Sequence, residues 1–577
     1  MNIPRLEYPR PQMVRNEWIN LNGVWQFEID HSGSGCERGL QKQTSLSGQI
    51  LVPFCPESKL SGVGYKDFMQ TVWYKRRFVL PPSWVGKRIL LHFGAVDYEA
   101  EIWVNSSFIG NHSGGYSSFA YDITEHLITD ENEITLCAKD NIRGGKQPHG
   151  KQSKRLQSYE CSYTRTTGIW QTVWLEPVTE EHIENFRLYP DPENACLFIQ
   201  ISIASFSEGQ TINARASLEG SLVGEISGKV NSEQLLLRLP LSKLELWEPG
   251  KPVLYDLDLS LTGNDQELDR VGSYFGMRSI AISGNLVYIN GKPIFQRLVL
   301  DQGFYPDGIY TAPSDEALKR DIELSMALGF NGARLHQKVF EQRFLYWADR
   351  LGYLVWGEYA DTGLDLSQDD VMRWILPEWQ EIITRDFNSP ALIVWCPLNE
   401  TRDNAQGTRL RPDLIKRIYE TTKRLDPTRP VIDASGFVHN ETDIFDVHEY
   451  EQDPDTFKRM FEPMRTGAPV YNTHPKAQHY QGQPYMVSEY GGTWWSPDFN
   501  PENQMSYGDR PSSSDQFIER FTALTSQLLN NPRICGLCYT QLYDVEQEVN
   551  GLYTYKREVK FDPSRIRAVL TQRAAIE

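Results

Sequence analysis

Two acidic residues stand near the ends of apolar runs that have the composition of buried strands. Glu400 closes the stretch VWCPLNE (394–400), and Glu489 lies in YMVSEYGG (485–492). Two carboxyl groups facing one pocket can cleave an acetal, because one donates a proton to the leaving oxygen while the other attacks or activates water. Repulsion between the two charges is expected to raise one pKa and so divide the roles. The alternative is that each Glu is a solvated loop residue.

Short apolar runs separated by turns fill the first 280 residues. The alternation and spacing of WQFEI (25–29), VWYKRRFVL (72–80) and NEITLCAK (132–139) predict a β-sandwich over residues 1–180. The runs CLFIQISIA (196–204) and VLYDLDLSL (253–261) predict a second, immunoglobulin-like sandwich over residues 181–280.

From about residue 281 the apolar spacing becomes helical. Ser314 is the expected N-cap of one helix, and Gly352 is expected to end the next. Further helices are expected over 372–387, 412–425 and 515–529, alternating with the strands YLVW (353–356), ALIVWC (391–396), VIDAS (431–435) and RICGLCYT (533–540). This alternation predicts a (β/α)8 TIM barrel over residues 281–577, with its chemistry at the carboxyl ends of the strands. A doubly wound sheet is the alternative, but the Gly-rich phosphate turn typical of it is missing.

The composition narrows the possible partners and compartment. A net charge of −18 argues against nucleic acid and anionic membranes as partners. The N-terminal stretch MNIPRLEYPRPQMVRNEW has no apolar core of a secretory signal, and no run reaches 18 apolar residues. A cytoplasmic protein is therefore expected, with its eight cysteines as free thiols. Cys535 and Cys538 form a CxxC inside an apolar run, without a second pair to complete a metal site.

Several short motifs carry a family resemblance that spans nearly the whole chain. The stretches LWEPGKPVLY (246–255), FGMR (275–278) and INGKP (289–293), together with Asn399-Glu400 and SEYG (488–491), resemble those of glycoside hydrolase family 2. The resemblance implies that Glu400 is the general acid/base and Glu489 the nucleophile of a retaining reaction, with the carboxyls about 5–5.5 Å apart. It also implies that Asn399 bonds the sugar 2-hydroxyl. Tyr450 is expected beside the nucleophile, the alternative being an ordinary core tyrosine.

Other positions depart from the family pattern. The stretch RLHQKV (334–339) stands where relatives have R-x-S-H-Y-P, DQG (301–303) stands where they have R-H-E, and Thr540 occupies a Trp position. Polar residues at these strand ends are candidate ligands for sugar hydroxyls: Asp301, Arg334, His336, Gln337, Glu358, His448, Asp544 and Glu546. Trp494 and Trp495 either stack on the substrate or anchor a loop, and residues 496–514 are predicted to form a loop over the barrel mouth.

The first functional hypothesis is a retaining exo-β-glycosidase acting on terminal β-linked sugars, most similar to a β-galactosidase. A β-glucuronidase or related uronidase ranks second, because EVNG (548–551) lacks the lysine of the family's N-x-K, although Lys556 and Arg557 are near in sequence. A non-catalytic carbohydrate-binding protein with a degenerate barrel is a third reading, which the presence of both Glu residues disfavours. A metal-dependent hydrolase ranks last, since His448, His474 and His479 form no recognisable ligand set.

No cofactor is expected from these hypotheses, although a structural Mg²⁺ or Na⁺ ion is compatible with the resemblance. The expected partner is an oligosaccharide or glycoside substrate, and a homo-oligomer is compatible with the family.

Overall fold

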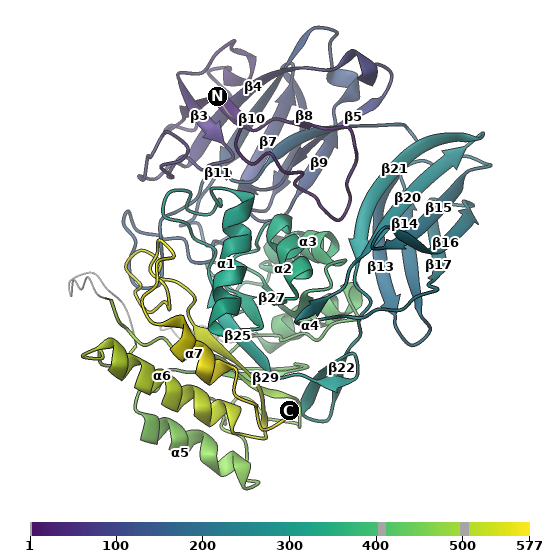
Figure 1. Ribbon diagram of the computed structural model, residues 1–577. Coiled ribbons are helices and arrows are strands. Elements are labelled where there is room, and N and C mark those ends of the chain that lie inside the picture. The colour runs from purple at the N-terminus through teal and green to yellow at the C-terminus, as the bar shows by residue number, and fades with distance from the viewer. Residues whose placement is uncertain (1–2, 402–410, 497–506) are drawn as a thin grey trace.

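The computed structural model describes residues 3–401, 411–496 and 507–577. Figure 1 shows two sandwiches packed beside a central barrel, with the N-terminus in the first sandwich and the C-terminus at the barrel. In the described segments no helix is long and apolar enough to cross a membrane. The predicted loop over the mouth falls partly on residues 497–506, which lie outside the described residues.

The first sandwich consists of two antiparallel sheets. The larger sheet has the order β3 (Gly48–Val52), β2 (Gly23–Ile29), β4 (Thr71–Val79), β10 (Glu131–Lys139), β7 (Glu99–Val104), β8 (Ser107–Ser113). The smaller has the order β1 (Ile19–Asn20), β12 (Val173–Val178), β5 (Arg88–Phe93), β9 (Phe119–Asp122). Side chains along β2 alternate between buried and partly exposed, so one face of this strand supplies Trp25 and Phe27 to the core.

The second sandwich is smaller and has its own apolar core. One sheet has the order β13 (Ile183–Asp191), β14 (Cys196–Ile203), β17 (Gln234–Pro240). The other has the order β16 (Ser221–Lys229), β15 (Thr211–Leu218), β20 (Tyr255–Gly263), β21 (Gln266–Phe275). The motifs LWEPGKPVLY (246–255) and FGMR (275–278) bond this domain to the barrel. Trp247 Nε1 donates to the carbonyl of Asp349, and Arg278 donates to those of Pro390 and Leu392.

Short elements complete the connections. The paired strands are β6 (Val96–Asp97) with β11 (Gly168–Ile169), β18 (Trp247–Glu248) with β19 (Lys251–Pro252), and the set β22 (Ile280–Ser283), β23 (Leu286–Ile289), β24 (Lys292–Pro293). The 3-10 turns are η1 (Leu40–Lys42), η2 (Pro82–Trp84) and η3 (Thr124–His126).

The third domain is a parallel sheet curled into a barrel. Its strand order is β28 (Leu392–Cys396), β27 (Leu354–Glu358), β26 (Gly332–Leu335), β25 (Gln296–Asp301), β31 (Ile534–Thr540), β30 (Tyr485–Gly491), β29 (Phe445–Glu449). The segment 431–435, predicted as a strand, meets β28 only through bridges from Trp395 to Val431 and from Asn399 to Ser435. On its other side Ser435 Oγ donates to Asp446 of β29, so this irregular segment takes the place between β28 and β29.

Helices alternate with these strands and include the five that the spacing predicts. They are α1 (Asp315–Leu328), α2 (Gln342–Leu351), α3 (Met372–Asp386), α4 (Pro412–Leu425), α5 (Pro454–Arg465), α6 (Ser514–Leu529) and α7 (Pro563–Leu570). Ser314 caps α1 by accepting from the Ala317 N–H, and Gly352 ends α2 in the left-handed conformation. The fold is therefore the predicted pair of β-sandwiches followed by a TIM barrel.

A loop of the first sandwich, residues 147–165, packs against the carboxyl end of the barrel. His149 N–H donates to the Thr362 carbonyl at 2.8 Å, and Gly150 N–H donates to the Ala360 carbonyl at 3.2 Å. Farther along, Tyr163 Oη donates to Glu548. This loop, which the sequence did not single out, brings side chains of the first domain to the barrel mouth.

Replacement of Gly150 by alanine is expected to loosen this contact. Its φ is +54°, and an added Cβ would lie 2.0 Å from the Gln337 carbonyl oxygen. Gly145→Ala is the matched control, since its φ is +70° but nothing lies within 4 Å of an added Cβ. Both changes carry the cost of a left-handed alanine, about 1–2 kcal/mol. Calorimetry should show a clearly larger drop in melting temperature for Gly150→Ala, and equal drops would contradict the docking contact.

Candidate active site

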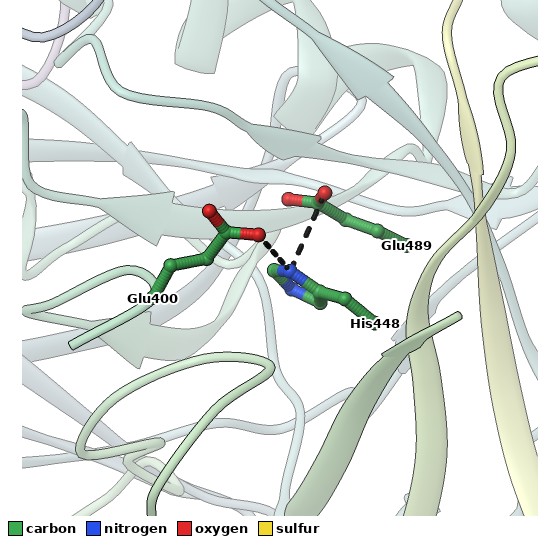
Figure 2. A group of neighbouring side chains, drawn as sticks. All are labelled: Glu400, His448 and Glu489. Carbon is green, nitrogen blue, oxygen red and sulfur yellow. Dashed lines mark hydrogen bonds and ion pairs between the residues drawn. The ribbon is translucent and has the colours of Figure 1, made fainter. Parts of the chain in front are cut away.

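The two predicted carboxyl residues meet at the barrel mouth, with a histidine between them (Figure 2). Glu489 lies within β30, not beyond it as the sequence suggested, and Glu400 follows β28 by four residues. One oxygen of each carboxyl and Nδ1 of His448 all lie within 4.8 Å of one another. Glu400 has a φ of +49°, a conformation that is uncommon outside glycine and that its surroundings must hold in place.

The guanidinium of Arg334 organises the floor of this site. Arg334 is fully buried on β26, and its Nη1 donates to Glu489 Oε1 at 2.8 Å. Its Nε donates to Glu358 Oε2 at 2.5 Å, and its Nη2 donates to Asn399 Oδ1 at 2.5 Å. Because a guanidinium presents its donors in a rigid fork, these contacts fix three side chains from different strands relative to one another.

His448 lies between the guanidinium and the acid/base candidate. Its Nδ1 is 2.9 Å from Glu400 Oε1 and 3.4 Å from Glu489 Oε2, while its Nε2 is 3.2 Å from Arg334 Nη1. A guanidinium only donates, so Nε2 accepts and the proton is assigned to Nδ1, from where it is donated to Glu400. Gly436, at φ +80°, lies against the ring so closely that an added Cβ would be 2.2 Å from it.

Tyr450 holds the other side of the nucleophile candidate. Its hydroxyl donates to Glu489 Oε2 at 2.5 Å and is 3.0 Å from Thr540 Oγ1. Its ring stacks on Tyr507 with centroids 3.6 Å apart. Tyr450 and Arg334 thus bind the two oxygens of Glu489 separately, which fixes the orientation of that carboxylate.

A second layer of polar residues supports the first. Glu358 accepts from Arg334, from the Gln337 N–H at 3.1 Å, and lies 2.9 Å from His336 Nδ1. Gln337 Nε2 donates to Asp361 Oδ1 at 2.6 Å, and the Asn399 N–H donates to the same oxygen at 3.1 Å. Glu358 and Gln337, proposed from the sequence as sugar ligands, are therefore fully engaged with protein, a position better suited to support than to substrate contact.

The electrostatics of the site differ from the sequence expectation. Burial alone would raise the pKa of Glu400, but the hydrogen bond from His448, with the nearby Lys151 and His336, holds that pKa below its usual range. Burial likewise opposes ionisation of Glu358, yet Arg334 and His336 lower its pKa to about 2. Repulsion between the pair was expected to raise one carboxyl pKa. For Glu400 the pKa is lowered instead, because of the surrounding donors and positive charges.

The remaining sequence candidates contact partners other than the carboxyl pair. Asp301 accepts from Tyr543 and the Gly303 N–H, Asp544 pairs with Lys560 at 2.8 Å, and Glu546 accepts from the Thr164 N–H. Trp495 packs on Phe561 with centroids 5.0 Å apart, and Arg510 lies over the ring of Trp494. These contacts favour structural positions for Asp301, Asp544 and Trp495.

Sequence reasoning missed several residues of the site. Asp361, Tyr507 and Ser435 lie on segments without a motif, and Lys151 and Tyr163 come from the first sandwich. Of these residues only Asp361 could have been found from the sequence, because it is a polar residue just past the end of strand β27.

Glu400, His448 and Glu489 also have the spacing of metal ligands, and no other such group occurs in the described part of the chain. Arg334 Nη1 already contacts Glu489 at 2.8 Å, and the Nδ1 proton of His448 points at Glu400. We assign this group to acid–base chemistry, for which side chains supply both the proton and the nucleophile without a cofactor.

A close carboxylate pair at the mouth of a TIM barrel, behind two sandwiches, defines the class of the protein as a glycoside hydrolase. Models of "Glycosyl hydrolases family 2" match the sugar binding domain at residues 60–151, the middle domain at 181–278 and the TIM barrel domain at 280–531. The chain belongs to glycoside hydrolase family 2, and it is a glycosidase.

Curated relatives are distant but extensive. A β-galactosidase of Thermoanaerobacter pseudethanolicus is 25% identical over 74% of this chain, which spans only about half (54%) of that relative. A β-glucuronidase of Paenibacillus borealis is 24% identical, with 74% of each chain covered. Among solved structures, β-glucuronidase of Ruminococcus gnavus superposes with a TM-score of 0.82 over all of both chains at 18% identity, a likeness of fold.

Tyr450→Phe is expected to lower kcat by about 100-fold, the usual cost of losing one preorganised donor to the reacting charge. The ring and its stack on Tyr507 remain, so the melting temperature should change little. Tyr471→Phe is the control, because its hydroxyl makes a similar bond, 2.6 Å to Glu449. Steady-state kinetics on both variants test this, and similar kcat values for the two would contradict the role of Tyr450.

His448→Leu is expected to shift the alkaline limb of the pH profile to higher pH. The Nδ1–H donor stabilises ionised Glu400 and lowers its pKa, so losing it raises that pKa and keeps the acid protonated further into the alkaline range. A bond to a charged group is worth about 1.5 kcal/mol, roughly one pH unit. The profile of kcat/KM measures the shift, with exposed His479→Leu as control. An unchanged or acid-shifted limb would argue against this tautomer.

Proposed function

We propose that this protein is a retaining exo-β-glycosidase in which Glu489 is the nucleophile and Glu400 the general acid/base. The observation that carries the proposal is the separation of the two carboxyls, whose nearest oxygens lie within 4.8 Å. Retaining enzymes hold their carboxyls about 5–5.5 Å apart, whereas inverting enzymes need about 6.5–9.5 Å to admit water.

In the first step Glu489 attacks the anomeric carbon while Glu400 gives its proton to the leaving oxygen, forming a glycosyl-enzyme ester. In the second step Glu400 takes a proton from water, whose oxygen displaces Glu489 and restores both residues. Arg334 and Tyr450 hold the attacking carboxylate. Asn399 Oδ1 accepts from Arg334, which leaves the amide NH2 to donate to the sugar 2-oxygen.

For the sugar itself we place a β-hexuronide, such as a β-glucuronide, ahead of the β-galactoside that the sequence favoured. The relatives named β-glucuronidase and the similar β-glucuronidase structures support this order, while the β-galactosidase relative keeps the second candidate open. The stretch EVNG (548–551) has no lysine in the place of the family's N-x-K, which argued against a uronide. Its Asn550 is buried and donates to Glu548. Arg557 is occupied by Asp321, and Lys556 is exposed.

The proposal predicts opposite products from two variants. On a panel of aryl β-glycosides (glucuronide, galacturonide, galactoside, glucoside, mannoside), Glu489→Ala should lose at least about 10⁴-fold of kcat. Azide should rescue it as a glycosyl azide of inverted configuration, because azide replaces the nucleophile. Glu400→Ala with azide should give the retained azide from an activated substrate. NMR of the products decides, and full activity of Glu489→Ala would sink the assignment.

A further inference from the structure

Lys151 of the first sandwich is carried to the barrel mouth by the docked loop. Its carbonyl accepts from the Tyr163 N–H at 2.7 Å, and the preceding Gly150 packs against the Gln337 carbonyl. The far arm of the loop is fastened as well, because Thr164 N–H donates to Glu546 at 3.2 Å. The barrel therefore holds the backbone just before Lys151, and the far arm of the loop, itself bonded to the barrel, holds the Lys151 carbonyl.

The acidic residues of the barrel mouth act electrostatically on Lys151, in agreement with the docking of its backbone there. Burial would lower the pKa of its ammonium group, but Cys161 on the same loop and the carboxylates of Glu400, Glu548 and Glu489 raise that pKa above its usual value. The influence is mutual, since Lys151 contributes to the lowered pKa of Glu400.

Lys151 differs from the buried lysines of the barrel, Lys338 and Lys560. Lys338 Nζ donates to the carbonyls of Gly303 and Tyr310, and Lys560 Nζ donates to Asp544 and the Val549 carbonyl. For Lys151 Nζ the structure has no hydrogen bond or ion pair within 4.0 Å among the described residues. Lys151 is half-buried, and an ammonium group at the mouth without a fixed protein partner is open to an anionic ligand.

We propose that Lys151 Nζ binds the carboxylate of a hexuronide whose anomeric carbon lies between Glu400 and Glu489. This proposal rests on the glycosidase function above and names its substrate class. The cation comes from the first sandwich instead of the last barrel strands, which accounts for the missing lysine near Asn550. The alternative is that Lys151 binds no substrate and only screens the negative charge of Glu548, which already accepts from Tyr163 and Asn550.

The test compares sugars that differ only at C6. 4-Nitrophenyl β-D-glucuronide is paired with the β-D-glucoside, and the β-D-galacturonide with the β-D-galactoside. Wild type, Lys151→Met and Lys151→Arg are assayed, each at its own pH optimum because Lys151 also affects Glu400. Lys154→Met is the matched control, an exposed lysine on the same loop.

Wild type should prefer the uronide of a pair. Lys151→Met should lower the uronide-to-neutral ratio of kcat/KM by about 10- to 100-fold, as expected for one charge-assisted hydrogen bond. Lys151→Arg should recover part of that ratio, and Lys154→Met should leave it unchanged. A ratio that Lys151→Met does not alter, or a wild type that hydrolyses only neutral glycosides, would overturn the proposal while leaving the glycosidase function in place.

A second measurement does not depend on turnover or on folding of the Lys151 variants. Calorimetric titration of the Glu489→Gln protein, which retains Lys151, should show tighter binding of D-glucuronate than of D-glucose. Equal or weaker binding of the acid would refute the assigned role of Lys151. If wild type cleaves no glycoside while glucuronate still binds in preference, the proposed reaction fails and the ligand class stands.

Discussion

The architecture of the site depends on one buried charge, the guanidinium of Arg334. It lies at the centre of the barrel with no solvent exposure, where an uncompensated cation would be strongly destabilising. Glu358 of β27, Glu489 of β30 and Asn399 beyond β28 supply its acceptors. The requirement to neutralise this one group therefore fixes the relative position of three strand ends, and the nucleophile candidate is one of the groups fixed.

The same arrangement sets the protonation state from which catalysis must start. Arg334 donates toward Nε2 of His448, which leaves the Nδ1 proton facing Glu400. Glu400 is thereby favoured as a carboxylate in the free protein, the form needed for the second, hydrolytic step. For the first step it must carry a proton. We infer that the leaving-group oxygen of the substrate replaces Glu400 as the partner of His448 Nδ1. Substrate binding would then remove the hydrogen bond that keeps Glu400 ionised.

The sequence predicted the fold and the carboxyl pair because both depend on local signals. Helical and alternating apolar periods, the Ser314 cap and the Gly352 terminator are properties of neighbouring residues, and strand ends of a parallel barrel converge at one face. The segment 431–435 shows the limit of such signals, since its apolar composition does not decide whether its backbone pairs fully. Glu358 and Gln337 show another limit, because polarity at a strand end does not reveal whether a partner such as Arg334 or Asp361 already occupies the side chain.

Lys151 could not be found by the same reasoning, because it lies about 250 residues before Glu400 and on a different domain. Its position depends on contacts such as Gly150 N–H to the Ala360 carbonyl, which no local pattern encodes. The barrel and the docked loop therefore have different roles in the site. The barrel strands hold Glu400, Glu489 and Arg334, so the reaction itself is constrained by a closed core. Side chains of the docked loop can be replaced without disturbing that core. We infer that this is why the carboxyl pair matches the family while the sugar pocket around it differs.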